Sequence, residues 1–307
     1  MDRSYHYDPL ETEEGLAEGY AIHSFPDGTV YDGHWKRGIP HGAMKVLFPD
    51  GLRYEGNYAQ GSANGPGKLV VPGKFTHEGD FLNGLPHGMG ITKWSDGCVY
   101  DGSFSEGLRQ GQGSMTYPDG AVYEGWWYED IRSGSGKVTF PDGATFQGLF
   151  QNDVPNGKGT MHFPDGRTYT GDFLNGNKNG LGIFDWPDGE HYEGEFRKDV
   201  RWGQGINVMP NGIRYEGQWK HDQRWGQGTQ VWPDGFRYEG PWWHNQPWGN
   251  GKCTWRSGAI YAGMMMNGYI TGFGKYTTPG GRVYTGLWCK GKLLFHSPKV
   301  EVGSDNS

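Results

Sequence analysis

One short pattern recurs along almost the whole chain at a fixed interval of 23 residues. Each copy opens with Tyr-x-Gly or a close variant, and no insertion or deletion separates the twelve copies. The copies begin at Tyr31, Tyr54, His77, Tyr100, Tyr123, Phe146, Tyr169, Tyr192, Tyr215, Tyr238, Tyr261 and Tyr284. So strict a period is typical of a repeat array, in which each unit packs mainly against its neighbours.

Each unit is predicted to form one β-hairpin. Pro-Asp-Gly recurs, as at 118–120; Pro presets φ, Asp bonds back to the backbone, and Gly takes the left-handed position. Such a turn with a following bulge joins two antiparallel strands. A second, longer connection, such as 82–88, holds residues suited to a positive φ at equivalent places, namely Gly84, Gly107, Asp130, Asp153 and Gly176.

The predicted fold class is all-β. Glycine accounts for 56 residues and aromatic side chains for 15% of the chain, a mixture that disfavours helices and suits strands and turns. Nothing in the sequence indicates a helix or a second sheet that could cover the aromatic face. We therefore expect an elongated, single-layer, twisted antiparallel meander of about twelve hairpins.

The aromatic side chains are predicted to share one face. Side chains alternate along a strand, so Tyr169, Gly171 and Phe173 point the same way. If the Pro-Asp-Gly turn pairs Phe163 with Arg167, the aromatic before the turn and the Gly-x-Gly positions join that face. The glycines then leave gaps into which neighbouring rings fit. The opposite face carries acids and is expected to stay wet: Asp32, Glu55, Glu78, Asp101, Glu124, Glu193, Glu216 and Glu239.

Charge and cysteine content narrow the function classes. The net charge is −7, of which −5 falls within residues 1–22, where six acidic residues face Arg3 alone. No basic stripe is apparent, so nucleic acid is not an expected partner. The apolar runs are too short for a membrane-spanning helix. Cys98, Cys253 and Cys289 lie far apart, which favours reduced thiols in a cytoplasmic protein.

The pattern resembles the MORN repeat, which runs roughly Tyr-Glu-Gly-x-Trp, x-Asn-Gly-x-x-x-Gly-x-Gly and then Asp-Gly. Residues 192–205 and 215–228 match it almost throughout, and the resemblance covers about residues 24–292. Some copies depart from it: His77 and Phe146 replace the leading Tyr, 72–74 lacks the Asp, and 261–266 lacks the acid and the aromatic. We expect those units to be distorted or specialised but present.

The resemblance implies a role as well as a fold. MORN proteins form elongated, twisted hairpin sheets and serve mainly as protein-interaction platforms, many of them in cilia, flagella and cytoskeletal structures. On this basis we expect a non-catalytic scaffold whose aromatic groove docks partner helices, peptides or another MORN sheet, in a ciliary, axonemal, radial-spoke-like or cytoskeletal assembly. The alternative is a membrane-associated adaptor that binds acidic phospholipids, which the absence of clustered Lys and Arg makes the weaker interpretation.

The predicted organisation leaves little room for an enzyme. It consists of an acidic arm at 1–22, the repeat array at 23–292 and a tail at 293–307. Asp-Gly recurs without the alternating oxygen ligands of an EF-hand, so turn chemistry explains it. His41 and His87 are two hairpins apart, too far for one metal ion. We expect neither catalytic residues, nor a cofactor, nor a metal.

Three tryptophans form the main candidate partner-binding site. Trp202, Trp225 and Trp248 occupy the same position in consecutive units, where other copies carry His, Asn, Gln, Ser or Thr. With units about 10 Å apart, the indoles form a ladder near one long edge. They either contact a partner, since Trp is enriched in binding hot spots, or stack to stiffen the array.

Other residues complete the predicted partner-binding set. They are the face aromatics Tyr215, Trp219, Tyr238 and Trp242, together with Met265. Met264, Met265 and Met266 either fill the core or form an adaptable docking surface. Axonemal or cytoskeletal proteins are the expected partners. Because both ends of the array are open sheet edges, homo-oligomers through end-to-end or groove pairing are a further possibility.

Overall fold

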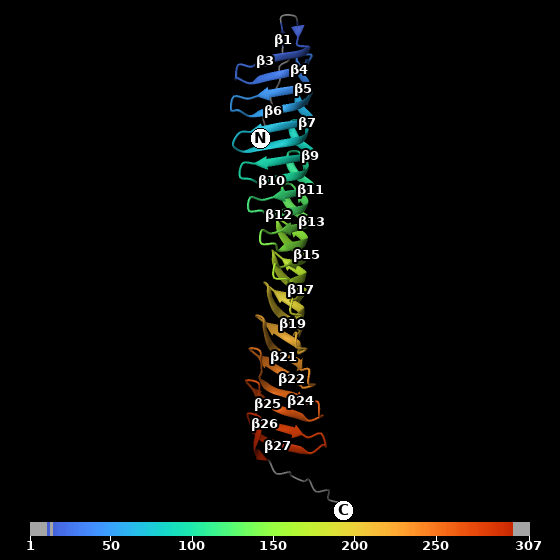
Figure 1. Ribbon diagram of the computed structural model, residues 1–307, viewed down its shortest axis with the longest axis vertical. Coiled ribbons are helices and arrows are strands. Elements are labelled where there is room, and N and C mark those ends of the chain that lie inside the picture. The colour runs from blue at the N-terminus through green and yellow to red at the C-terminus, as the bar shows by residue number, and fades with distance from the viewer. Residues whose placement is uncertain (1–10, 13–14, 297–307) are drawn as a thin grey trace, which may run out of the picture. The chain divides into compact units, whose positions relative to one another are not determined.

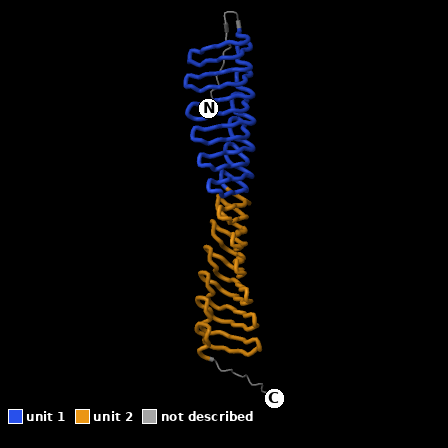
Figure 2. Tube along the Cα trace, in the orientation of Figure 1, with its two compact units in different colours: residues 1–154 blue, residues 155–307 orange. Residues whose placement is uncertain are grey.

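The structure is a computed structural model that describes residues 11–12 and 15–296. Every regular element in this described part is a β-strand. No helix there is long and apolar enough to cross a membrane. The chain divides into two compact units, residues 1–154 and 155–307 (Figure 2).

In the first unit, hairpin follows hairpin in chain order (Figure 1). A short pair, β1 (Glu11–Thr12) and β2 (Gly15–Leu16), precedes the meander. The meander comprises β3 (Gly19–Ser24), β4 (Val30–Lys36), β5 (Ile39–Leu47), β6 (Arg53–Ala59), β7 (Ser62–Val71), β8 (Phe75–Leu82), β9 (Leu85–Trp94), β10 (Val99–Ser105), β11 (Leu108–Thr116), β12 (Val122–Tyr128), β13 (Ile131–Thr139) and β14 (Thr145–Gln151).

The second unit repeats the arrangement. Its strands are β15 (Val154–His162, whose first residue is assigned to the first unit), β16 (Thr168–Leu174), β17 (Asn177–Asp185), β18 (His191–Arg197), β19 (Val200–Val208), β20 (Arg214–Lys220), β21 (Gln223–Val231), β22 (Arg237–Trp243), β23 (Gln246–Pro247), β24 (Gly249–Thr254), β25 (Ile260–Met266), β26 (Tyr269–Thr277), β27 (Val283–Cys289) and β28 (Lys292–His296). Within the meander of each unit, successive strands pair antiparallel, except that β23 and β24 both pair with β22. This confirms the predicted all-β hairpin array.

The Pro-Asp-Gly turns form as predicted. The N–H of Phe163 donates to the carbonyl of Arg167 (2.9 Å), and the N–H of Gly166 donates to the carbonyl of Phe163 (3.0 Å). Gly166 has a φ of 88°. This is a three-residue turn closed by a left-handed glycine.

The second connection is shorter than predicted. β16 ends at Leu174 and β17 begins at Asn177, so two residues make the turn. Both have positive φ, 49° at Asn175 and 82° at Gly176, as the tight hairpin turn that matches strand twist requires. The predicted connection was too long because the Asn-Gly and Gly-x-Gly segments both resemble loops in sequence. In the structure only Asn-Gly forms the turn, and the Gly-x-Gly segment lies within the next strand.

A bulge bends most of the hairpins near this turn. Gly171 pairs with Gly182, but the next pair is Phe173 with Lys178, so three residues lie opposite Asp172 alone. The same shift follows Gly125 in the first unit and Gly217 in the second. A bulge bends its strand and increases the local twist. The bend brings the leading ring of each unit over the glycine pair.

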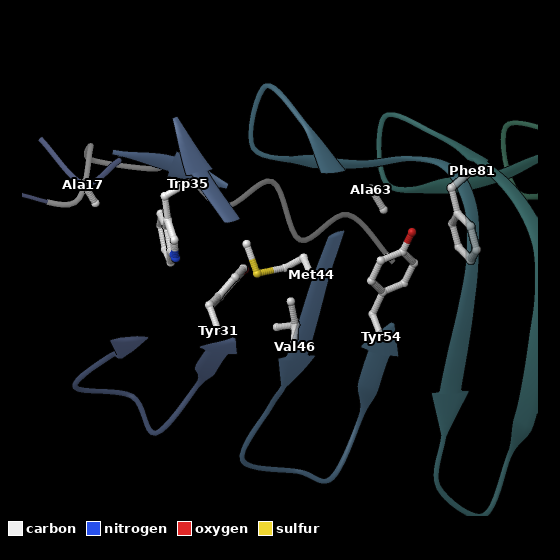
Figure 3. Close-up of a cluster of buried hydrophobic side chains, with 8 residues drawn as sticks. All are labelled: Ala17, Tyr31, Trp35, Met44, Val46, Tyr54, Ala63 and Phe81. Carbon is white, nitrogen blue, oxygen red and sulfur yellow. The ribbon is translucent and has the colours of Figure 1, made fainter. Parts of the chain in front are cut away.

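The aromatic core forms on the predicted face, which we call the inner face. Figure 3 shows part of it in the first unit, where Tyr31, Met44 and Val46 lie close together. The ring of Tyr54 meets Tyr58 of its own copy (centroids 5.4 Å apart) and Phe81 of the next copy (5.1 Å), both edge-to-face. Such pairs add about 0.5–1.5 kcal/mol each beyond burial, so neighbouring repeats stabilise one another.

The opposite, outer face carries the predicted acids. Six of the eight are exposed, and Asp32 and Glu239 are half-buried. Some pair across strands, as Lys45 with Glu55 and Lys68 with Glu78, each at 3.1 Å. Exposed pairs of this kind contribute little to stability. Their effect is to keep this face hydrated.

The atypical units are present. β8 and β14 contain His77 and Phe146 at the leading position. At 72–74 the N–H of Lys74 still bonds to the carbonyl of Val71 (3.0 Å). Strand β25 places Met265 in the core. β3 begins inside the predicted arm and β28 runs from Lys292 into the predicted tail, but most of the arm (1–22) and tail (293–307) falls outside the described residues.

Candidate interaction surfaces

The inner face presents a stripe of aromatic side chains beside its buried core. The stripe consists of the aromatic residues that directly precede a turn, all of them half-buried except for the more exposed Phe140. We call it the pre-turn stripe: Phe25, Phe48, Trp94, Tyr117 and Phe140 in the first unit, and Phe163, Trp186, Trp232 and Trp255 in the second. Its rings are held by neighbours, as Trp186 by Phe184 (centroids 4.3 Å apart). The stripe is therefore rigid and open to contact.

Cations also line the inner face of each unit, and we call this set the cation row. It comprises Arg109 and Arg132 in the first unit and Lys178, Arg201 and Arg224 in the second. The guanidinium carbon of Arg109 lies 4.3 Å from the ring centre of Trp127, and that of Arg201 lies 4.4 Å from Trp219. Cations over indole faces at this distance are attracted by the ring quadrupole. The face is thus cationic as well as aromatic.

Each arginine of this row also binds the next repeat's tight turn. Nε of Arg109 donates to Oδ1 of Asp130 (2.8 Å), and its terminal nitrogen donates to the Asp130 carbonyl (2.9 Å). Arg132 with Asp153, and Arg201 with Asp222, repeat this clasp. Asn245 takes the place of the acid for Arg224. The clasp fixes the cation and joins adjacent hairpins.

Sequence reasoning missed this row, because its members stand 23 or more residues apart and form a stripe only in the fold. A signal was present: a basic residue nine positions after the leading aromatic, with Asp or Asn seven positions after the next one. In the second unit two arginines also reach buried carboxamides, since Arg201 donates to Asn207 (3.2 Å) and Arg224 to Gln230. Burial lowers the pKa of Arg224.

Five of the predicted partner-binding residues are buried on the inner face. They are Tyr215, Trp219, Tyr238, Trp242 and Met265, none more than 5% exposed. The hydroxyl of Tyr215 donates to the Gln218 carbonyl (2.9 Å), and the indole of Trp219 donates to the Gly205 carbonyl (3.2 Å). Burial raises the pKa of both tyrosines. These side chains hold the array together and offer a partner little surface.

The predicted tryptophan ladder lies on the outer face instead. The Trp202 ring packs edge-to-face on His221 (centroids 5.0 Å apart). Trp225 packs on Trp243 (4.0 Å) and His244 (5.4 Å). Trp248 is 39% exposed. Each packed indole thus contacts the turn of the following repeat, and no ring contact joins two ladder members in the described part of the chain.

Polar residues at the ladder position of other units show what this position does in the array. Oδ1 of Asn64 accepts a hydrogen bond from the N–H of Asn83 (3.4 Å), and Oε1 of Gln110 accepts one from Glu129 (3.1 Å). The position therefore supports the first residue of the next turn. Trp202 and Trp225 replace that hydrogen bond with a ring contact to a histidine.

The methionines separate between the two faces. Met265 fills the core, whereas Met266 is 41% exposed on the outer face. Met264 packs near Gly272 on that same side. Of the three methionines at 264–266, only Met266 therefore offers an open thioether.

The titratable groups do not converge on one point in the residues that the structure describes. No group of three or more His, Cys, Asp and Glu side chains there could hold a metal ion. His41 is exposed and His87 half-buried, each in its own hairpin. Cys98 is half-buried, Cys253 buried and Cys289 exposed. Burial raises the pKa of Cys253 to about 12, so this thiol stays protonated.

A family model described as MORN repeat matches twelve segments of the chain: 13–30, 31–53, 54–72, 77–99, 100–122, 123–145, 146–166, 169–191, 192–214, 215–237, 238–260 and 261–281. Eleven segments begin where the sequence period places a copy; the match adds 13–30 and stops before the copy at Tyr284. A search of curated proteins found no match.

Similar solved structures include two from Drosophila melanogaster. The SAS-4 (dCPAP) TCP domain in complex with a proline-rich motif of Ana2 is 13% identical, with 69% of this chain and 100% of that chain covered and a TM-score of 0.29. The TCP10c domain of Sas-4 is 14% identical, with 66% and 99% covered and a TM-score of 0.24. The G-box domain of the microcephaly protein CPAP is 16% identical, with 80% and 97% covered and a TM-score of 0.26.

Proposed function

The chain belongs to the MORN repeat family, whose repeats indicate a protein-binding or membrane-associated role, and from this premise we propose that it is a non-catalytic protein-interaction scaffold. The proposed partner is a helix, an extended peptide or another MORN sheet. It docks on the inner face of the array.

One observation carries this proposal. The pre-turn stripe is half-exposed although the core beside it is fully buried, and no second layer covers it within residues 15–296. Its rings are held by ring contacts and stand next to fixed cations, as Trp94 beside Arg109 (6.0 Å from its ring centre). Rigid aromatic and arginine side chains are the residues that dominate protein interfaces.

The cellular setting is proposed from the family alone. We propose a cytoplasmic scaffold of a ciliary or flagellar axoneme, such as a radial spoke, or of the cytoskeleton. The scattered titratable groups of the described residues are consistent with a non-catalytic role. The proposed scaffold role requires neither a cofactor nor a metal ion.

The test is affinity capture from the cell of origin with the wild-type chain and with a stripe variant. The variant carries Trp94→Val and Trp186→Val, because Val71 occupies the same repeat position. Capture of axonemal or cytoskeletal proteins by the wild type and its loss in the variant would support the proposal. Equal capture by both chains, with both folded, would contradict inner-face docking.

Membrane association is the second candidate. The cation row favours it, because anionic headgroups attract lysine and arginine. Its arginines are already bound to turn residues, however, as Arg109 to Asp130. Flotation with phosphatidylserine vesicles decides the matter: strong, salt-sensitive binding would favour the adaptor, and its absence would favour the scaffold.

We also propose that copies of the chain can pair. Among the described strands, β3 pairs only with β4, and β28 pairs only with β27. Each end of the array therefore presents an unpaired edge, which is a template for another strand. Light scattering across a concentration series tests this, and a monomer at every concentration would contradict it.

A further inference from the structure

The outer face of the second unit carries a strip of aromatic and basic side chains in addition to the buried core of the inner face. We call it the tryptophan strip: Trp202, Trp225, Trp243 and Trp248 with Arg197 and Lys220. Trp243 and Trp248 are 47% and 39% exposed. Large exposed rings in successive repeats are unusual on the hydrated face of a sheet, so the strip is a candidate binding surface.

The indole nitrogens of the strip differ from those of the core. Core indoles donate to backbone carbonyls of the preceding repeat, as Trp219 to Gly205 and Trp242 to Gly228, both at 3.2 Å. Within the described part of the chain, the indole N–H groups of Trp202, Trp225 and Trp248 have no such acceptor. They remain available as donors to a bound molecule.

The two cations of the strip also differ from those of the inner face. Arg197 lies over Trp202 (5.2 Å) and Lys220 over Trp225 (4.6 Å). No carboxylate lies within ion-pair distance of either one in residues 15–296. On the inner face, by contrast, Arg109, Arg132 and Arg201 each bind a turn aspartate. The strip thus has uncompensated positive charge complementary to an acidic ligand.

The distance between successive repeats matches one particular peptide conformation. Successive repeats are two strand spacings apart, about 9.4–9.8 Å. A polyproline II helix advances about 9.3 Å every three residues. A peptide in that conformation would therefore place an equivalent residue over each ladder indole. Its backbone carbonyls have no internal hydrogen bonds and can accept from the free indole N–H groups.

We propose that the tryptophan strip binds an acidic, proline-rich segment of a partner protein in the polyproline II conformation. Proline rings pack on Trp202, Trp225 and Trp248, and carboxylates of the segment pair with Arg197 and Lys220. Aromatic-lined surfaces recognise such segments because the ligand is already ordered before binding. The inference rests on the proposed scaffold function and adds a second surface, separate from the inner face, with a defined ligand class.

A membrane surface is the competing occupant, and the strip fits it less well. Polybasic lipid-binding segments carry clusters of about 4–8 basic residues. The strip has two, and Lys198 is the only further Lys or Arg next to them in the sequence. In addition, Trp202 and Trp225 are held against His221 and His244, so they present fixed surfaces rather than free tips.

The experiment measures binding of the full chain to a synthetic peptide of four Pro-Pro-Glu triplets, by calorimetry and indole fluorescence. Two control peptides replace either every Pro by Ser or every Glu by Lys. We expect saturable binding of the first peptide and at least tenfold weaker binding of both controls. Equal binding of the Ser peptide would overturn the proposal.

The matched variant is Trp202→Asn, Trp225→Asn and Trp248→Asn in one chain, because Asn64 occupies the ladder position elsewhere. We expect at least a tenfold loss of affinity, whereas Trp126→Leu, at another exposed outer-face indole, leaves affinity within twofold. Arg197→Gln with Lys220→Gln should weaken binding at least threefold and reduce its salt dependence.

Two further results would overturn the inference: affinity unchanged in the triple variant, whether or not its stability falls, or binding only to phosphatidylserine vesicles. The inner-face capture experiment is unaffected by these changes. Failure of the strip is therefore distinguishable from failure of the scaffold proposal.

Discussion

The hydroxyl of Tyr123 donates a hydrogen bond of 2.9 Å to the carbonyl oxygen of Trp126, three residues along the same strand. To reach it, the ring crosses Gly125 and covers Gly136 of the paired strand. The bulge frees this carbonyl from the strand ladder. The same bond recurs from Tyr54, Tyr100, Tyr169, Tyr192, Tyr215, Tyr238 and Tyr261. It explains why the leading residue is tyrosine and why glycines surround it.

Removal of the hydroxyl should therefore cost stability without disturbing the fold. We expect Tyr123→Phe to lower the free energy of unfolding by about 0.5–1.5 kcal/mol, the usual net value of a hydrogen bond. The chain supplies its own control at Phe146, where Phe is native and fully buried. Urea unfolding followed by circular dichroism compares the unfolding midpoint of Tyr123→Phe with that of the wild type. An unchanged midpoint in Tyr123→Phe would show that the bond adds nothing beyond ring packing.

A methyl group at Gly136 should be far more damaging. An added Cβ would lie 2.6 Å from Cε2 and the hydroxyl oxygen of Tyr123, so the ring would have to move. Overpacking of this kind costs about 1–3 kcal/mol. Gly280→Ala is the matched control, because a Cβ there meets nothing within 4 Å. Equal unfolding midpoints for the two variants would contradict this account of the glycine positions.

These contacts mark the limit of what the sequence reveals. The 23-residue period, the Pro-Asp-Gly turn between Phe163 and Arg167, and the shared face of Tyr169 and Phe173 were all predictable, because turn chemistry and strand alternation are local. The bond from Tyr123 to Trp126 was not, since it depends on a bulge that leaves no separate signal in composition. Burial of a candidate site likewise depends on the assembled sheet.

For the candidate surfaces, too, repeat positions were predictable from the sequence but their places in the fold were not. The repeat position of Trp202 and Trp225 was evident, but its location on the outer face followed only from the register. The cation row needed the fold to bring distant residues into line. Sequence reasoning placed Trp219 at a partner contact because it belongs to the predicted aromatic face; the structure shows a buried core side chain.

The clasp between Arg109 and Asp130 should tolerate loss of charge better than loss of geometry. Asp130 has a φ of 69° and accepts from the backbone N–H and Nε of Arg109. Asp130→Asn should change stability by less than about 0.5 kcal/mol, because half-exposed ion pairs are worth little and Asn245 serves Arg224 in the same way. Asp130→Ala loses both hydrogen bonds and the left-handed preference, and should cost about 1–3 kcal/mol. Thermal unfolding in low and high salt compares the stability of the two variants. Similar losses of stability in Asp130→Asn and Asp130→Ala would show that the charge, and not the geometry, stabilises the clasp.

His77 should make the first unit sensitive to acid. Its ring replaces the leading tyrosine and is 1% exposed. Its Nδ1 lies 2.8 Å from the Thr92 hydroxyl, and Nε2 has no hydrogen-bond partner in the described part of the chain. Burial lowers the pKa of His77 from 6.5 to about 4. The unfolded chain therefore binds a proton that the folded chain excludes between these values, and stability falls as the pH drops from about 6.5 to about 4.

Replacement by the consensus residue tests this dependence. His77→Tyr removes the titrating group, and its hydroxyl should reach the Asp80 carbonyl as Tyr123 reaches Trp126. We expect the difference in unfolding free energy between pH 7 and pH 4.5 to be smaller in His77→Tyr than in the wild type. His41→Asn is the control for loss of an imidazole, because that side chain is exposed rather than buried. If His77→Tyr retained the full acid sensitivity of the wild type, His77 would not be the source of that sensitivity.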